Sequence, residues 1–125
     1  MMRVHAPALV LLTSVACSAL VETTVDNPRP FDPPAAFVEW WLEMESCSGL
    51  EGPIERVSWF VADGLTTNRK LVLGRWDPPH DITILAGLTE DRSLVQHEIL
   101  HDLLGGDPDH RDPAWEACGV EGRGN

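Results

Sequence analysis

Large apolar side chains recur at helical spacing over residues 33–46, and the run ends at Gly49. Asp32 is placed to cap this helix, with prolines in its first turn. The apolar positions are Phe37, Trp40, Trp41, Met44 and Cys47. Aromatic residues at this spacing pack into a core more often than they bind a ligand, so we interpret the Trp pair as core. The pattern predicts an amphipathic helix over 33–46.

Strand-like patterns follow in three short segments, 56–62, 70–76 and 82–86. Asp63-Gly64 and Asp77-Pro78-Pro79 separate these segments and are typical of turns. Alternate positions of the first segment are held by Val57, Trp59 and Val61. This is the pattern of a strand with one face on a core, so we expect a small three-stranded sheet.

A second helix is predicted from Thr89, its capping residue, to Leu104, where Gly105-Gly106 ends it. Its apolar residues lie on nearly every side, so the helix must be buried. The same helix carries His97, Glu98 and His101. Polar side chains in a buried helix are costly unless a metal ion or hydrogen-bond partners satisfy them. The cluster therefore indicates a metal site, with histidines satisfied by protein partners as the alternative.

The composition allows one folded domain, which we place at residues 33–125, after a proline-rich, mobile tether over 20–32. The chain has 125 residues, 43% hydrophobic and 23% charged, which is typical of a globular protein with a single modest core. Its net charge is -11, and its 9 Lys and Arg residues are not clustered. Such a surface repels nucleic acids, so we exclude them as partners.

Residues 1–19 have the features of a signal peptide, so we expect the chain to be exported. Arg3 precedes an apolar run that is too short to span a bilayer, and small residues follow. Cleavage after Ala19 would give a secreted protein, whereas cleavage before Cys17 would attach a lipid to this cysteine and tether the protein to the bacterial cell envelope. The stretch Ser14-Val15-Ala16-Cys17 resembles a bacterial lipobox, apart from Ser14, where that motif usually has leucine.

Three cysteines leave an even pair once Cys17 is lipidated or removed with the signal peptide. In an exported protein the remaining Cys47 and Cys118 are expected to form a disulfide. Closing a loop of this length stabilises a fold by about 4 kcal/mol in the chain-entropy model. Two separately buried thiols are the alternative.

Residues 97–101 read His-Glu-Ile-Leu-His. On a helix the two histidines share a face and can bind one zinc ion, while the glutamate beside them can move protons. This motif resembles that of the zincin superfamily of metallopeptidases. The resemblance implies His97 and His101 as zinc ligands and Glu98 as general base. Together with the elements predicted above, it gives a small zincin-like α+β domain with an N-terminal helix, a three-stranded sheet and a buried metal-binding helix. In the order of its elements, the chain resembles small uncharacterised exported bacterial proteins and lipoproteins.

His110 is our preferred third zinc ligand. The loop that leads to it from the end of the helix reaches up to about 20 Å, so its return to the metal is easy, and imidazole suits zinc better than a surface carboxylate does. Asp107 and Glu116 are the alternatives. Asp107 stands where the metzincin branch of the zincins has its third ligand, and Glu116 is the candidate for the distant glutamate of the gluzincin branch.

The chemistry expected of three imidazoles around zinc is hydrolysis, because the metal keeps an open position for water. Glu98 would take a proton from this water as it attacks a peptide carbonyl and pass it to the leaving amine. The strand over 82–86 would pair with an extended peptide or protein substrate. The alternative function is a non-catalytic zinc-binding or envelope-interaction protein that retains the metal helix.

Further polar residues have weaker expected roles. The chain has no Tyr, so His80 and Arg111 are the candidates for a second electrophile. Asp102 and Asp107 are the candidates for hydrogen-bond support of the metal-binding histidines.

Overall fold

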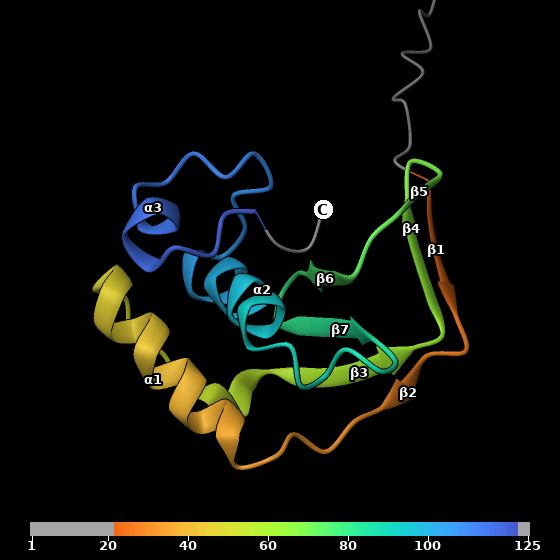
Figure 1. Ribbon diagram of the computed structural model, residues 1–125, viewed down its shortest axis with the longest axis horizontal. Helices are drawn as coiled ribbons and strands as arrows, with labels where there is room; N and C mark the ends of the chain where they lie inside the picture. The colour runs from red at the N-terminus through yellow and green to blue at the C-terminus, as the bar shows by residue number, and fades with distance from the viewer. Residues whose placement is uncertain (1–21, 123–125) are drawn as a thin grey trace, which may run out of the picture.

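The computed structural model describes residues 22–122 and shows a mixed α+β fold with two sheets, of which the larger packs against the helices (Figure 1). The predicted signal peptide, with Cys17, lies outside the described residues. Within the part of the chain that the structure describes, each helix is too short or too polar to cross a membrane.

Helix α1 (Ala36–Ser48) is the predicted N-terminal helix, and it begins later than expected. The Pro33-Pro34 pair explains the delay, because a residue that precedes proline is disfavoured in helical conformation. Asp32 is therefore not the cap, and Ala35 occupies that position without a side-chain hydrogen bond. Gly49 ends the helix in the left-handed conformation, as the sequence predicts.

The apolar face of α1 enters the core. Phe37, Trp41 and Met44 are buried, and Trp40 is partly buried with its ring stacked on Phe37 at 5.1 Å between centroids. The Trp pair therefore packs into the core, as predicted.

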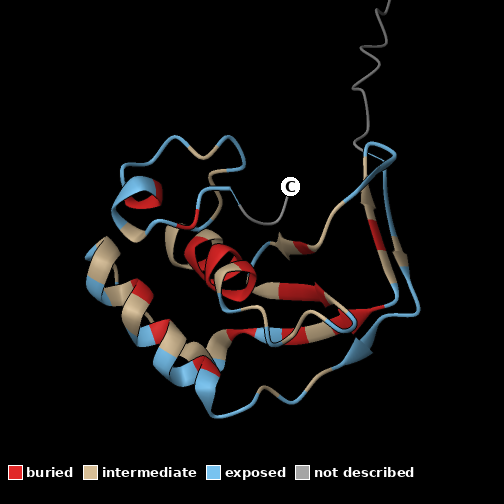
Figure 2. Ribbon diagram, viewed as in Figure 1, coloured by how far each residue is buried: buried red, intermediate tan, exposed pale blue. Residues whose placement is uncertain are grey.

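Helix α2 (Arg92–Leu104) is the predicted metal helix. Its cap is Asp91 rather than Thr89, since the Asp91 carboxylate accepts a hydrogen bond from the backbone N–H of Leu94 at 3.1 Å. Figure 2 shows that this helix is buried along most of its length, against α1 on one side and the sheet on another. It lies in the middle of the core.

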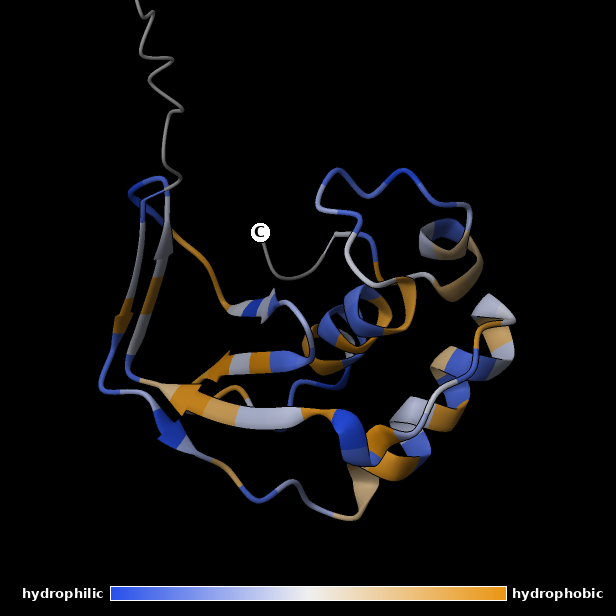
Figure 3. Ribbon diagram, turned by 180° about the vertical axis from the view of Figure 1, so that it is seen from behind, coloured by the Kyte–Doolittle hydropathy of each residue, from blue (hydrophilic) through white to orange (hydrophobic). Residues whose placement is uncertain are grey.

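The larger sheet has four strands in the order β2 (Arg29–Pro30), β3 (Ser58–Ala62), β7 (Asp81–Leu85) and β6 (Gly74–Asp77). β3 and β7 run parallel, and β6 is antiparallel to β7. The inner strands are strongly apolar (Figure 3), and Trp59, Ile82 and Ile84 join the core. β6 forms one edge of this sheet and contacts α2.

The smaller sheet is antiparallel and has the order β1 (Thr23–Asp26), β4 (Gly64–Thr67) and β5 (Lys70–Leu71). β4 follows β3 after the single residue Asp63, so one stretch of chain runs directly from the larger sheet into the smaller one. Figure 1 shows the smaller sheet standing apart from the helices as a separate wall.

The prediction of one three-stranded sheet is wrong. Segment 70–76 is divided between the two sheets, because the backbone N–H of Val72 donates to Leu65 and the carbonyl of Leu73 accepts from Leu85. β4 has no apolar alternation, since only Leu65 among its residues is buried, and so the pattern did not reveal it.

Residues 22–32 belong to the folded domain rather than to a free tether. Val25 of β1 is paired with Leu65 of β4, and Pro30 of β2 is paired with Phe60 of β3. The extended conformation of this proline-rich segment agrees with its sequence. Its pairing was missed because an edge strand tolerates proline and need not be apolar.

Two short helices are also absent from the prediction, η1 (Ile54–Arg56) and α3 (Ala114–Cys118). The predicted disulfide between Cys47 and Cys118 is present and joins the end of α1 to the end of α3. α3 and the segment after it are thereby fixed beside the helix that carries the histidines.

Candidate metal centre

The structure brings the three predicted histidines together. His97, His101 and His110 each offer a ring nitrogen, and these atoms all lie within 4.8 Å of one another. Nε2 of His110 is 3.1 Å from Nε2 of His97 and 3.1 Å from Nε2 of His101. The three rings therefore converge on one point.

The local backbone explains this convergence. His97 and His101 are one turn apart on α2, so their side chains share a face. Gly105 and Gly106 follow with φ of 69° and 140°, conformations that glycine adopts without strain, and they turn the chain back towards the helix. The loop then presents His110, which itself has a positive φ of 54°.

Backbone carbonyls fix the orientation of two of the rings. Nδ1 of His97 donates to the carbonyl oxygen of Val120 at 2.6 Å, and Nδ1 of His101 donates to that of Gly106 at 2.7 Å. Because a carbonyl can only accept, Nδ1 carries the proton in both rings, and both Nε2 atoms of the neutral imidazoles direct lone pairs into the cluster. These are the supporting hydrogen bonds that were expected from Asp102 and Asp107, and neither carboxylate makes them.

The donor set fits a metal ion. Burial lowers the pKa of His97 to about 4 and also lowers the pKa of His101, so protonation does not neutralise the facing lone pairs at neutral pH. The single Nε2 of His110 cannot donate to both neighbours at once. A tetrahedral zinc ion with bonds of about 2.0–2.1 Å separates its imidazole nitrogens by about 3.3 Å, close to the observed spacing.

Trp115 of α3 closes the cluster from one side. Its ring centroid lies 4.7 Å from that of His97, 4.6 Å from that of His101 and 4.6 Å from that of His110. Its indole N–H donates to the Asp107 carboxylate at 2.7 Å. Trp115 was not expected at the site, because nothing in its local sequence pattern relates it to the histidine motif.

Asp107 and Glu116, the alternative third ligands, lie outside the histidine cluster. The Asp107 carboxylate accepts the backbone N–H groups of Arg111 and Asp112 as well as the Trp115 indole, and these hydrogen bonds lower its pKa. Asp107 therefore shapes the loop that presents His110. Glu116 is exposed on α3.

Glu98 is a buried carboxylic acid that faces a cavity. Its residue is 2% exposed, and burial raises the pKa of its carboxyl group to about 8. Among residues 22–122 the structure gives this carboxyl no hydrogen-bond donor. Gly74 of β6 allows its close approach, because a Cβ at that position would lie 3.1 Å from both Cγ and Oε1 of Glu98.

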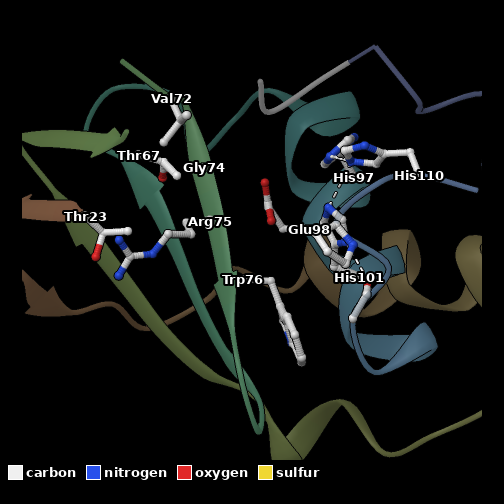
Figure 4. A pocket seen from close by; sticks show the side chains of 12 residues that line it. Thr23, Thr67, Val72, Gly74, Arg75, Trp76, His97, Glu98, His101 and His110 are labelled. Atoms are coloured by element: carbon white, nitrogen blue, oxygen red, sulfur yellow. Dashed lines mark hydrogen bonds between the residues drawn. The ribbon is translucent and has the colours of Figure 1, made fainter. Parts of the chain in front are cut away.

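The cavity has a volume of about 370 Å³ and lies between α2, β6 and the smaller sheet (Figure 4). All three histidines and Glu98 line it, so the proposed ligands and base open onto one space. The strand beside the site is β6. The expectation that the strand over 82–86 pairs with substrate is wrong, because β7 is already paired on both sides, with β3 and β6.

Asp102 has a different role from the one expected. Its fully buried carboxylate accepts hydrogen bonds from Nε of Arg56 at 2.9 Å, from the Trp76 indole at 3.1 Å and from Nδ1 of His80 at 2.7 Å. This cluster ties α2 to β6 and to the chain that precedes β7. His80 is engaged there rather than at the metal centre, and the Arg111 side chain is 83% exposed and lies near Asp109.

The chain has no detected relatives. No family model, no curated protein and no solved structure matches it.

Proposed function

We propose that this chain is a small zinc-dependent peptidase that hydrolyses peptide bonds in an exported peptide or protein substrate. The observation that carries the proposal is the convergence of three Nε2 atoms next to a buried carboxyl group that opens onto the same cavity. The motif lies on a buried helix beside a sheet edge, which supports the expected resemblance to zincins. The disulfide is consistent with an exported protein, either secreted or lipid-anchored at Cys17.

His97, His101 and His110 would hold the metal, with the carbonyls of Val120 and Gly106 keeping two of the rings in the required tautomer. Zinc, when bound, supplies Lewis acidity that lowers the pKa of water and polarises a carbonyl. Glu98 would accept the proton that water loses as it attacks the peptide carbonyl and would deliver this proton to the leaving amine. A neighbouring dication favours the ionised form of Glu98, which offsets the effect of burial on its pKa.

A non-catalytic zinc-binding or envelope-interaction protein is the second candidate. The observation that favours it is the lack of a second electrophile: His80 is engaged by Asp102, Arg111 points to solvent near Asp109, and the chain has no Tyr. This function requires the same metal centre and does not require Glu98.

Zinc content and peptide cleavage distinguish the candidates. The full chain should bind one equivalent of zinc, and His97→Ala should lose it. Glu98→Gln should keep the zinc and lose cleavage of a broad peptide library. Equal cleavage by the native protein and Glu98→Gln overturns the peptidase proposal, and zinc binding without cleavage in either protein supports the second candidate. Failure of the native protein to bind zinc overturns both.

A further inference from the structure

Arg75 has an unused hydrogen-bond donor inside the cavity. Its Nε donates to the Asp77 carboxylate at 2.7 Å, whereas its Nη1 is buried and has no partner among residues 22–122. An orphaned guanidinium donor costs free energy, which is recovered when an acceptor binds. Nη1 itself is covered, but the Arg75 side chain as a whole is 20% exposed and lines the cavity, so a ligand there can contact this side chain.

Strand alternation places Arg75 on the opposite side of β6 from Glu98. Gly74 packs on Glu98 and Trp76 bonds to Asp102, so both neighbours of Arg75 face α2, and Arg75 itself must face away from α2. Figure 4 shows this separation, with Glu98 and the histidines on one side of the strand and the Arg75 guanidinium on the other. The residues that line the cavity nevertheless include both Glu98 and Arg75.

Two threonines of the smaller sheet share the Arg75 side of the cavity. Thr23 of β1 and Thr67 of β4 are directly paired across their strands, and both line the cavity with Arg75. Their hydroxyl groups add further donors. Val72 provides an apolar neighbour. This part of the cavity therefore combines a guanidinium group with hydroxyl groups, and both kinds of donor bind carboxylates.

The geometry of an extended peptide fits this division. β6 pairs only with β7 in the described part of the chain, which leaves its outer edge available for a further strand. In a strand paired there, successive side chains point to opposite faces. If one peptide residue directs its side chain towards Glu98 and the histidines, the residues before and after it direct their side chains towards Arg75.

We propose that Arg75, with Thr23 and Thr67, forms a carboxylate-binding subsite that selects peptides with an anionic group beside the bond to be cleaved. The subsite rests on the proposed function, of which it defines the substrate class. Arg75 is the only lining residue of the cavity with a permanent positive charge among those described, and the chain as a whole carries -11. The net negative charge of the chain repels anionic ligands in general. A carboxylate is therefore attracted within the cavity by Arg75 alone among the described lining residues.

The carboxylate has two sources, an Asp or Glu side chain within the peptide or the free carboxyl group at its C-terminus. Three short matched peptides distinguish them: one with a central Glu and an amidated end, one with a central Gln and a free end, and one with a central Gln and an amidated end. Binding is measured by calorimetry on zinc-loaded Glu98→Gln protein, so that no turnover is required, and is repeated without zinc.

We expect at least one carboxylate peptide to bind about tenfold or more tightly than the neutral peptide, as a charged hydrogen bond predicts. Arg75→Gln should remove this difference, and Arg75→Lys should restore part of it. Arg29→Gln is the matched control, because Arg29 also pairs with a nearby aspartate, Asp63, but does not line the cavity. Circular dichroism of each variant checks that the fold is retained.

The subsite is overturned if the carboxylate and neutral peptides bind alike, including the case in which none binds, or if Arg75→Gln leaves the difference intact in a folded protein. Water would then satisfy Nη1. Cleavage of peptides without any carboxylate preference removes the subsite and leaves the peptidase proposal standing. If peptide binding depends on Arg75 but the protein cleaves no peptide, the subsite stands and the peptidase proposal is removed.

Discussion

Val120 holds His97 in place: the carbonyl oxygen of Val120 accepts a hydrogen bond from Nδ1 of His97 at 2.6 Å. Val120 lies two residues beyond Cys118, whose disulfide to Cys47 fixes α3 against α1. The orientation of His97, a candidate metal ligand on the buried helix, is therefore linked through two residues of chain to a partly buried disulfide.

The disulfide should affect both stability and metal affinity. Replacing Cys47 and Cys118 together by serine should lower the free energy of unfolding by about 4 kcal/mol in the chain-entropy model. Zinc affinity should fall by about 10–100-fold, the usual effect of losing a partner that orients a ligand. Chemical denaturation and competitive zinc titration measure the two effects. An unchanged zinc affinity in the folded variant would mean that Val120 is positioned without the disulfide.

His110 should be essential for the metal, and Glu116 should not. His110→Ala removes one of three converging nitrogens, so zinc affinity should fall by more than about a hundredfold, beyond the range for a supporting partner. Glu116→Gln is the control and should bind zinc as the native chain does. The assignment fails if the two variants bind zinc equally well.

Glu98 should make the stability of the zinc-free protein depend on pH. Its pKa is raised from 4.5 to about 8 by burial, so folding favours the protonated form. The resulting stabilisation is complete below pH 4.5 and is lost as the pH rises towards 8. The loss should be roughly 1 kcal/mol per pH unit. Glu98→Gln does not ionise, so thermal melts in chelator should show its advantage over the native chain growing across this range.

His97 provides an internal control for that experiment, since its contribution to stability changes with pH in the opposite direction to that of Glu98. Its pKa is lowered from 6.5 to about 4, so its contribution is present above pH 6.5 and is lost as the pH falls through about 4. This acid-side loss should persist in Glu98→Gln. If the variant and the native chain instead follow the same curve above pH 5, Glu98 is not protonated in the folded protein.

Gly74 should matter for activity and not for metal binding. Adding a Cβ at this position brings it within 3.1 Å of Cγ and Oε1 of Glu98, so Gly74→Ala should displace the carboxyl group. A small misplacement of a catalytic group can cost up to about a hundredfold in rate, so cleavage should fall about tenfold or more while zinc content stays at one equivalent. Gly122→Ala is the control, because a Cβ there meets nothing within 4 Å. Equal cleavage rates in the two variants would mean that the position of the Glu98 carboxyl group does not affect the reaction.

The elements that the sequence predicted well are those with a local cause. The two long helices follow from the spacing of their own apolar residues, and the buried character of α2 from its apolar residues on every side. The grouping of His110 with His97 and His101 follows from a short loop with two glycines. In each case the determining residues are neighbours in the chain.

The features that were missed depend on contacts between distant segments. β1 and β2 contain polar residues and proline, and they become strands only because β4 and β3 offer them an open edge. The carbonyl of Val120 supports His97 from a segment 23 residues away, next to the disulfide, and a backbone group has no sequence pattern. Asp102 was assigned to the histidines by proximity in sequence, whereas its partners come from η1, β6 and the turn before β7.

Because β3 continues directly into β4, the chain reaches the cavity wall before it reaches the histidine helix, and the two parts of the site come from separate stretches of sequence. Everything that would grip the ion, from His97 to Val120, is encoded in one uninterrupted stretch near the C-terminal end, while the facing wall of the cavity comes from residues 23–76. Apart from Gly74 beside Glu98 and Trp76 bonded to Asp102, selection or engineering can therefore diversify the wall and change which ligands are accepted while the coordinating stretch is inherited intact. A small domain of this layout would offer a compact template for transplanting new recognition surfaces next to an unchanged cluster of three histidines.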